Sequence, residues 1–323
     1  MSGRYDNIFS VSKYYDDGEK RIFSIVNIPE NEEIFKKYKV SKNDYFMAIL
    51  SWQHDKEWFI ESYNILVNYN INPDNFYILC NTKFQLVDAL NVGFKNAFFI
   101  NRHFNLDYNY YKVDKSVVKD FDACIFGEQH NRNRIPLSFG VNKLAIVDGN
   151  AKWNKNWNYP KDAWRNLASC GTNGMIIQET MRKSWCGLCL SEKESMCWSS
   201  LEFFYNGIPV VTTNNHTGRM EWYDSNNSIV LQSITPSLEE IENAIQLCKG
   251  KINDGSFDSE KIRNDAIQKS EFFRNEFVNM TSRIIGDDNV AKECFITKYE
   301  QRMLYEKHWK SFDDTLKLLN NIN

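Results

Sequence analysis

Three glutamates in one short segment are the side chains of this sequence best suited to chemistry. Glu192 and Glu194 lie in an acidic turn, and seven residues separate Glu194 from Glu202. Two carboxylates can act as the acid and base of a glycosidase, and one carboxylate can accept hydrogen bonds from the diol of a ribose. A helix that begins near Ser199 would direct free backbone N–H groups outward, which suits an anion such as a diphosphate.

The elements around these residues form a strand, a helix and a second strand. Apolar runs predict buried strands at 187–191 and 209–213, and the helix at 199–206 ends before Gly207. In an open α/β sheet, the loops at the carboxyl ends of the strands face the ligand crevice. We therefore expect Glu192, Glu194 and Ser195 to line a cleft, with Glu202 one turn into the helix.

Short apolar runs alternate with amphipathic stretches along most of the chain, which is typical of an α/β fold with parallel strands. The pattern predicts strands at 45–50, 75–80, 97–101, 123–127 and 144–148, and helices at 56–69, 83–91, 176–183, 237–249, 261–285 and 291–319. Ser237 and Glu240 have the spacing of a capping box, and Gly250 is expected to end that helix.

The spacing of Glu194 and Glu202, followed by the run Asn-Gly-Ile-Pro-Val-Val-Thr-Thr at 206–213, resembles the E-x7-E segment of the family 4-type glycosyltransferases, the "group 1" transferases of GT-B fold. The run at 217–222 resembles a stretch from one branch of that family. The likeness lies mainly within residues 121–285. It implies an α/β protein with two Rossmann-like domains facing a cleft, and with C-terminal helices.

Three parts follow from this resemblance and from the predicted elements. An N-terminal α/β domain at 1–115 would lie on the acceptor side. A C-terminal α/β domain at 116–285 would bind the nucleotide sugar, and a helical tail at 286–323 would pack back on the N-terminal domain.

The family's roles carry over as implications of the resemblance. Glu202 would bind the ribose hydroxyls, Glu194 would lie near the donor sugar, and backbone N–H groups around 195–199 would hold the diphosphate. The family usually has glycine directly after the first glutamate, where this sequence has Ser195. His216, which follows the strand at 209–213, would lie near the donor sugar, together with Gly218 and Glu221.

The family also supplies cationic side chains for the diphosphate, from the loop after the first strand of the C-terminal domain. This sequence has Glu128 where the arginine of that pair is expected, and Arg134 and Arg132 are the displaced candidates. A leaving diphosphate needs cationic stabilisation, and arginine binds phosphate in a bidentate way. Two solvated loop arginines are the alternative.

Two histidines follow strands of the N-terminal part. His54 follows the strand at 45–50, and Asn101 and His103 lie at the end of the strand at 97–101. These positions face the expected cleft, so we predict His54 and Asn101 on the acceptor side. We predict His103 as a catalytic group beside Glu194, Arg134 and Arg132. Hydrogen-bonded loop histidines are the alternative.

Composition limits the partners. The 323 residues carry 39 basic and 42 acidic side chains, a formal net charge of −3, so no global field draws the protein onto nucleic acid. No apolar run approaches the ~20 residues of a membrane span, and the first residues lack a signal peptide's apolar stretch. Peripheral membrane association stays open. Eight cysteines without that signal predict reduced thiols in the cytoplasm, the host cytoplasm if the sequence is viral.

The predicted function is a hexosyltransferase-type glycosyltransferase of polysaccharide biosynthesis. It would move a sugar from a UDP- or GDP-sugar to a glycan, a lipid-linked glycan or another acceptor, with retention of anomeric configuration. We expect no cofactor and no metal, because helix N–H groups and arginine take the metal's place. One alternative is a transferase acting on modified DNA bases, although residues 1–115 lack a basic excess. The other is a non-catalytic nucleotide or sugar binder of the same fold.

Two further patterns compete with this interpretation. Cys186 and Cys189 have the C-x-x-C spacing of thiol redox sites, which normally place their thiols at a helix N-terminus. Here both lie on an expected apolar strand, which favours buried strand cysteines on opposite faces. Glu192 and Glu194 could form a glycosidase pair, but the helix and strand that follow favour the transferase.

Overall fold

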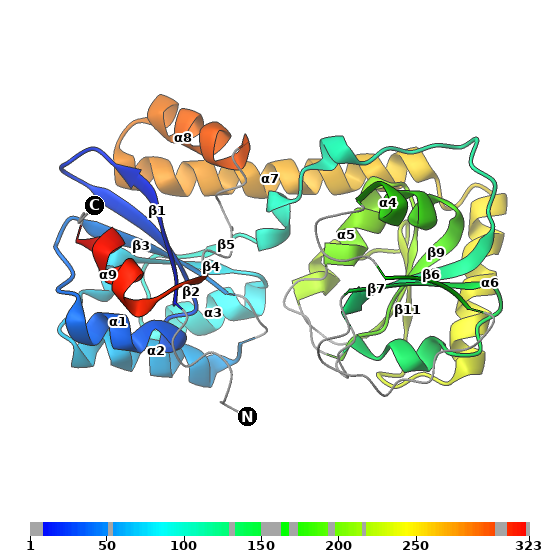
Figure 1. Cartoon of the computed structure of the whole chain (residues 1–323), viewed down its shortest axis with the longest axis horizontal. Coiled ribbons are helices and arrows are strands. Elements are labelled where there is room, and N and C mark those ends of the chain that lie inside the picture. The colour runs from blue at the N-terminus through cyan, green and yellow to red at the C-terminus, as the bar shows by residue number, and fades with distance from the viewer. Residues whose placement is uncertain are drawn as a thin grey trace. The chain divides into compact units, whose positions relative to one another are not determined.

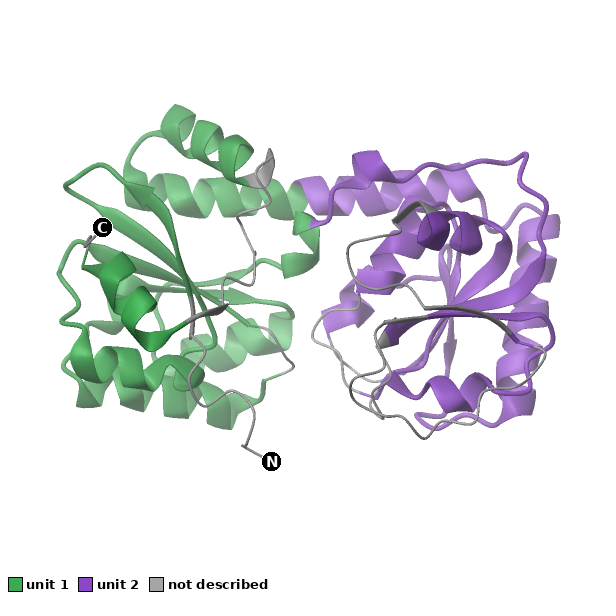
Figure 2. Ribbon diagram, viewed as in Figure 1, with its two compact units in different colours: residues 1–105, 272–323 green, residues 106–271 purple. Residues whose placement is uncertain are grey.

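The computed structural model describes residues 9–50, 54–128, 133–149, 163–167, 174–192, 198–214, 218–300 and 309–320. The chain forms two compact units, coloured separately in Figure 2. Unit 1 comprises residues 1–105 and 272–323, and unit 2 comprises residues 106–271. Each unit contains one six-stranded sheet.

The sheet of unit 1 has the strand order β12-β1-β2-β3-β4-β5. Strands β2 to β5 are parallel, and β1 pairs antiparallel with both β2 and β12. The strands are β1 (Phe9–Asp16), β2 (Arg21–Val26), β3 (Asp44–Ile49), β4 (Phe76–Cys80), β5 (Ala97–Phe99) and β12 (Trp309–Lys310). The helices are α1 (Glu32–Lys37), α2 (Lys56–Asn68), α3 (Lys83–Val92), α8 (Asp288–Glu300) and α9 (Phe312–Leu319), with the C-terminal part of α7 (Ser259–Ile285).

The two faces of this sheet are covered by different helices (Figure 1). Phe46 and Ala48 of β3 belong to the core cluster that includes Phe59 of α2. The alternate residue Met47 is equally buried but lies outside that cluster, as the period of two in a strand requires. On the other face, Phe273 of α7 packs edge-to-face against Phe99 of β5, with ring centroids 5.1 Å apart.

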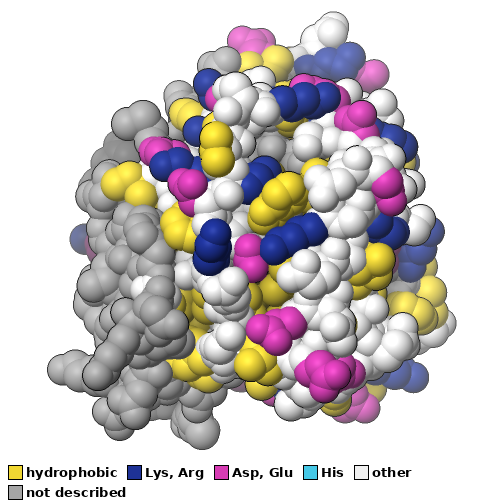
Figure 3. All heavy atoms as spheres, turned by 90° about the vertical axis from the view of Figure 1, so that its right-hand side faces the viewer, with side chains coloured by type: hydrophobic (Ala, Val, Ile, Leu, Met, Phe, Trp, Pro, Cys, Tyr) yellow, Lys and Arg dark blue, Asp and Glu magenta, His cyan; other side chains and the backbone are white. Residues whose placement is uncertain are grey.

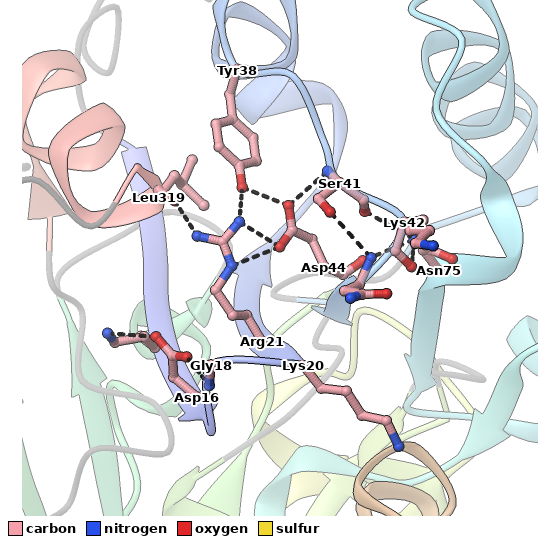
Figure 4. A network of polar contacts seen from close by, with 12 residues as sticks. Asp16, Gly18, Lys20, Arg21, Tyr38, Ser41, Lys42, Asp44, Asn75 and Leu319 are labelled. Carbon is pink, nitrogen blue, oxygen red and sulfur yellow. Dashed lines mark hydrogen bonds and ion pairs between the residues drawn. The ribbon is translucent and has the colours of Figure 1, made fainter.

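A buried ion pair joins the amino ends of β2 and β3 (Figure 4). Arg21 Nη2 lies 2.6 Å from Asp44 Oδ1, and the Asp44 side chain is 0% exposed. The Tyr38 hydroxyl donates to Asp44 Oδ2 at 2.6 Å, and Arg21 Nη1 donates to the carbonyl of Leu319 at 2.8 Å. One guanidinium therefore ties the C-terminal helix α9 to the parallel sheet.

The sheet of unit 2 is entirely parallel, with the strand order β11-β10-β9-β6-β7-β8. The strands are β6 (Phe121–Glu128), β7 (Leu144–Gly149), β8 (Trp164–Leu167), β9 (Ser184–Cys189), β10 (Val210–Thr213) and β11 (Ser228–Leu231). The helices are α4 (Gly174–Arg182), α5 (Trp198–Tyr205), α6 (Leu238–Asn253) and the N-terminal part of α7, and a 3-10 turn, η7, spans Gly218–Trp222.

Helix α5 is pressed closely against β9. A Cβ atom at Gly187 would overlap the ring of Phe203, so only glycine permits this approach. The helix ends at Tyr205, and Gly207 follows with φ 71°, a conformation that favours glycine. The predicted end of this helix is therefore confirmed, and the helix runs from the carboxyl end of β9 into the unit.

The structure corrects two predicted helices. Gly250 does not end α6, which continues to Asn253; the exposed glycine is tolerated inside the helix, and Gly255 with φ 80° follows instead. The capping box of Ser237 and Glu240 is present. The long helix predicted at 291–319 is wrong: α8 ends at Glu300, and β12 and α9 follow separately, because residues 309–310 pair with β1 and Ser311 caps α9.

The unit boundaries lie earlier in the chain than the sequence pattern placed them. Residues 106–115 belong to unit 2, where the Tyr108 hydroxyl donates to Glu271 Oε1 at 2.8 Å and Arg263 donates to the Tyr108 carbonyl. Residues 272–285 belong to unit 1, because Phe273 and Phe277 pack on its aromatic side chains. Helix α7 is thus shared by both units.

The charges on the visible face of the molecule are mixed. Figure 3 shows lysine and arginine side chains interspersed with aspartate and glutamate, in keeping with the formal net charge of −3. Among the described residues, we find no helix both long and apolar enough to span a bilayer.

Candidate functional site

The strand order of unit 2 places a switch point between β6 and β9. From β6 the chain proceeds outward through β7 and β8, then returns to the other side of β6 for β9, β10 and β11. In open parallel sheets, ligands bind outside the carboxyl ends of the strands at such a point. The loops after β6 (129–134) and after β9 (190–197) are therefore the first places to look for a ligand site.

An ion pair joins these two loops. Arg134 Nη2 lies 3.2 Å from Glu192 Oε2, and the side chains are 16% and 58% exposed. Arg134 has φ 51° and also donates to the carbonyl of Ile234. The structure thus brings the predicted arginine to the switch point, where its guanidinium is engaged by a carboxylate of the neighbouring loop.

A second arginine, which the sequence did not single out, lies behind this edge. Arg219 of η7 is 0% exposed. Its Nη1 donates to Ser191 Oγ at 2.7 Å, and its Nη2 donates to the Ser191 carbonyl at 2.8 Å and to Thr213 Oγ1 at 3.0 Å. Arg219 therefore ties together the carboxyl ends of β9 and β10.

Glu202 lies one turn into α5, where it is held by a tyrosine. The Tyr111 hydroxyl donates to Glu202 Oε1 at 2.9 Å. Burial, and then the negative charge of Glu202, raise the pKa of Tyr111, so the phenol stays protonated and acts as the donor. The Tyr111 bond therefore fixes one oxygen of the Glu202 carboxylate.

The structure describes three of the remaining residues that were predicted on the donor side. Ser199 is buried in the first turn of α5, with its Oγ 3.8 Å from Cys189 Sγ. In η7, Gly218 is buried and Glu221 is half-buried. Four further predicted residues lie outside the described residues: Glu194, Ser195, Arg132 and His216.

The carboxyl edge of the unit 1 sheet holds the predicted acceptor-side histidine. His54 Nε2 lies 3.0 Å from Asn27 Oδ1, and Asn27 Nδ2 donates to Glu30 Oε1 at 3.0 Å. The His54 ring stacks on Trp58 with centroids 4.3 Å apart. Burial lowers the pKa of His54 to about 4, so the ring is neutral at pH 7 and Nε2 is the protonated nitrogen that donates to Asn27.

Asn101 and His103 lie deeper at the same edge. His103 Nδ1 is 2.6 Å from Asn101 Oδ1, and Asn101 Nδ2 donates to the Asn81 carbonyl at 2.9 Å. Asn101 is 0% and His103 1% exposed. Asn81 Nδ2 donates in turn to the Leu50 carbonyl, so this network links the ends of β3, β4 and β5. A catalytic role for His103 stays a prediction.

The two cysteines with C-x-x-C spacing are buried core residues of a strand and do not form a reactive thiol site. Cys186 and Cys189 are free and buried in β9. A hydrogen bond with Cys248 and burial raise the pKa of the Cys186 thiol, opposite to the shift of a reactive thiol. Cys189 accepts a hydrogen bond from Ser200 Oγ at 3.1 Å. Across the described residues, no three His, Cys, Asp or Glu side chains cluster as metal ligands would.

Sequence reasoning missed Arg219, Tyr111 and Asn27. Arg219 directly follows Gly218 in a run that was already of interest, so its position was the available signal. Its burial depends on tertiary packing. Tyr111 is 91 residues from Glu202 in the chain, and Asn27 is 27 residues from His54, so neither pairing had a local signal.

Comparison with known proteins gives structural matches only. No protein-family model and no curated protein matches the sequence. TarM of S. aureus matches with a TM-score of 0.60 and 15% identity, over 80% of this chain and 54% of TarM. HepE of Anabaena, in complex with UDP, matches with a TM-score of 0.57 and 14% identity, over 74% of this chain and 72% of HepE. Sucrose-phosphate synthase of Thermosynechococcus elongatus matches with a TM-score of 0.54 and 9% identity, over 80% of this chain and 74% of the synthase.

These likenesses establish the fold. The chain has the GT-B fold, an α/β architecture with parallel sheets and C-terminal helices, as the resemblance in its sequence implied. The chain spans about half the length of TarM.

Proposed function

We propose that this protein is a glycosyltransferase that uses a nucleotide-sugar donor. The observation that carries the proposal is the convergence of charged groups at the switch point of unit 2. Arg134 lies there, Arg219 lies directly behind it, and Glu202 lies on the helix that starts from it. Cations beside a helix start suit a diphosphate, and a carboxylate one turn into the helix suits a ribose diol.

Structural neighbours support a nucleotide-sugar donor. HepE has been solved with UDP and with UDP-glucose, and a TarM variant has been solved with UDP and alpha-GlcNAc-glycerol. On this basis we assign UDP- or GDP-sugars as the donor class. Glu202 would bind the ribose, and the Ser195–Ser199 backbone and Arg134, with Arg132, would bind the diphosphate. Glu194, His216, Gly218 and Glu221 would surround the sugar.

In the proposed reaction, the bond between the anomeric carbon and the diphosphate oxygen breaks, and an acceptor hydroxyl oxygen takes its place with retention of configuration. The proton of that hydroxyl passes to the leaving diphosphate. The developing charge falls on the diphosphate, where positioning and electrostatic support lower the barrier. Glu192 competes for Arg134, so a bound diphosphate would have to displace that carboxylate.

The acceptor side remains a proposal about unit 1. His54 presents a neutral ring at the carboxyl edge of its sheet, and Asn101 and His103 brace the same edge. Neutral hydrogen-bonding groups of this kind suit a hydroxylated acceptor, so we propose a glycan or lipid-linked glycan. A cytoplasmic location and a role in polysaccharide biosynthesis are parts of the same proposal.

Donor hydrolysis without acceptor tests the activity. Wild type should slowly release nucleoside diphosphate from one of the common UDP- or GDP-sugars, as measured by chromatography. Glu202→Ala should abolish the release while keeping a native melting temperature. Glu271→Ala is the matched control, because Glu271 also accepts a hydrogen bond from a tyrosine in unit 2. Binding without any release would favour a non-catalytic binder, and equal release by Glu202→Ala would overturn the site.

A further inference from the structure

Arg219 is the largest fully buried side chain among the described residues, and its charge has no acidic neighbour there. Its side chain is 0% exposed, and its hydrogen bonds go to the hydroxyl and carbonyl oxygens of Ser191 and Thr213. No described carboxylate forms an ion pair with it, and its Nε has no hydrogen-bond partner among the described residues. Neutral oxygens solvate a guanidinium but do not neutralise it.

A buried charge without a counter-charge is costly. Arg21, although it is 20% exposed, has the buried carboxylate of Asp44 2.6 Å away. A neutral side chain could brace two strand ends at lower desolvation cost. The guanidinium of Arg219 therefore points to an anion that the described residues do not provide, such as a bound ligand.

The position of Arg219 indicates which anion. Ser191 is two residues beyond β9, and Thr213 is the last residue of β10. The segments that lead from these two residues carry four of the donor-side predictions: Glu194, Ser195, His216 and Gly218. The guanidinium therefore lies behind the edge where a ligand of the parallel sheet would bind.

We propose that Arg219 is a positioning residue that holds Ser191 and Thr213 and provides the fixed positive charge against which the diphosphate of the donor binds. This proposal deepens the proposed function and rests on it. Arg219 does not touch the ligand. It holds Ser191 at the carboxyl end of β9, and its charge acts on the ligand through space in the low dielectric of the protein interior.

The test is a charge series of ligands. Binding of UDP, UMP and uridine, and of GDP, GMP and guanosine, is measured by calorimetry for wild type, Arg219→Gln and Arg219→Lys. Arg219→Gln should weaken diphosphate binding by about tenfold or more, weaken monophosphate binding less, and leave nucleoside binding unchanged. Arg219→Lys keeps the charge but loses the forked contacts to Ser191 and Thr213. It should lower all affinities together and keep the diphosphate-to-nucleoside affinity ratio within about threefold of wild type.

Arg21→Gln is the matched control, because it removes a half-buried guanidinium that also joins two strand ends, in unit 1. It should lower stability and leave the affinity ratio unchanged. An Arg219→Gln protein that keeps the wild-type ratio, or that loses nucleoside and diphosphate binding alike, would overturn the proposal. If Arg219→Gln does not fold, Arg219→Lys decides, since a tenfold fall in its ratio contradicts a role for the charge. If the wild type binds no nucleotide, the proposed function itself is wrong.

Discussion

Two arginines, Arg21 and Arg219, lie at opposite kinds of sheet edge and are treated differently by the fold. Arg21 lies at the amino edge of the unit 1 sheet, paired with the buried carboxylate of Asp44 and bonded to the Leu319 carbonyl. Arg219 lies at the carboxyl edge of the unit 2 sheet, where its partners are the neutral oxygens of Ser191 and Thr213. Both join neighbouring strand ends, but among the described residues a carboxylate pairs with Arg21 and none pairs with Arg219.

This difference indicates two roles. Arg21 stabilises the fold, whereas Arg219 provides a charge for a ligand. At an amino edge of a parallel sheet no ligand is expected, so the charge must be satisfied internally. At a carboxyl edge an unbalanced cation costs stability in the free protein, and an anionic ligand can recover that cost on binding. Variants at the two edges should therefore divide between loss of stability and loss of affinity.

The largest effect, on the free energy of unfolding, is expected from breaking the ion pair between Arg21 and Asp44. Asp44→Ala leaves Arg21 without its counter-charge and also removes the acceptor of the Tyr38 hydroxyl. Removal of one partner of a buried pair costs about 3–5 kcal/mol. Urea unfolding should show this loss, and nucleotide affinity at low temperature should be unchanged.

Lys95→Ala serves as the control for that variant. It breaks an ion pair with Asp74 whose side chains are 75% and 42% exposed, and exposed pairs contribute about 0–1 kcal/mol. An Asp44→Ala protein no less stable than Lys95→Ala would remove the contrast between the two arginines.

The next effect concerns packing beside the carboxyl edge of unit 2. Gly187→Ala places a methyl group in the Phe203 ring and must push α5 from β9. Overpacking of this kind costs about 1–3 kcal/mol. Since α5 carries Glu202, we also expect weaker nucleotide binding by calorimetry. Unchanged stability and affinity together would mean that α5 does not depend on this contact. Gly250→Ala, at an exposed position with open space around it, is the control and should not destabilise.

A smaller effect is expected from Tyr111, whose neutral hydroxyl donates a hydrogen bond to Glu202 in unit 2. Tyr111→Phe removes the hydrogen bond to Glu202 Oε1 and lets that carboxylate turn. Hydrogen bonds to charged groups contribute about 1.5–3 kcal/mol. The lower end of this range corresponds to about a tenfold loss of nucleoside diphosphate affinity, which we expect here. Tyr108→Phe removes the equivalent bond to Glu271 and should leave affinity intact. Equal losses in both variants would mean that Tyr111 has no special relation to the ligand.

The smallest effect at neutral pH concerns His54 at the carboxyl edge of unit 1. Its folded pKa of about 4 is below the ~6.5 of a free imidazole, so between these values the unfolded chain binds a proton that the folded chain does not. The stability that neutral His54 contributes is complete above about pH 6.5 and is lost as pH falls toward 4. Urea unfolding at pH 7.5 and pH 5 should show a steeper loss for wild type than for His54→Asn. Parallel losses would contradict a buried, neutral His54.

Local patterns in the sequence were enough for most strands of the two parallel arrays, but not for β2, β8 and β11, which were not predicted. Continuous apolar runs such as 45–50 and 209–213 correspond to β3 and β10, and Ser237 with Glu240 correctly placed the start of α6. The antiparallel strands β1 and β12 were also missed. Strand β12 has only two residues and pairs with β1 across about 300 residues of chain, so it has no local signal.

The candidate site was predicted in type but not in contacts. The sequence predicted that Glu202 and Arg134 lie near the switch point, since strand–helix order fixes which loops share an edge. It could not provide the partners Tyr111 and Glu192, nor the burial of Arg219, since these depend on side chains brought together only by the folded chain.

Calorimetric titration of wild type and Glu202→Ala with UDP, GDP, ADP, CMP and their common sugar conjugates tests the central claim most directly. We expect saturable binding of one nucleoside diphosphate and its sugar by wild type. Glu202→Ala should lose this binding, while Glu271→Ala, the matched glutamate variant of unit 2, should retain it. A folded wild type that binds none of these nucleotides, or a Glu202→Ala protein with undiminished affinity, would contradict a donor site at the carboxyl edge of the unit 2 sheet.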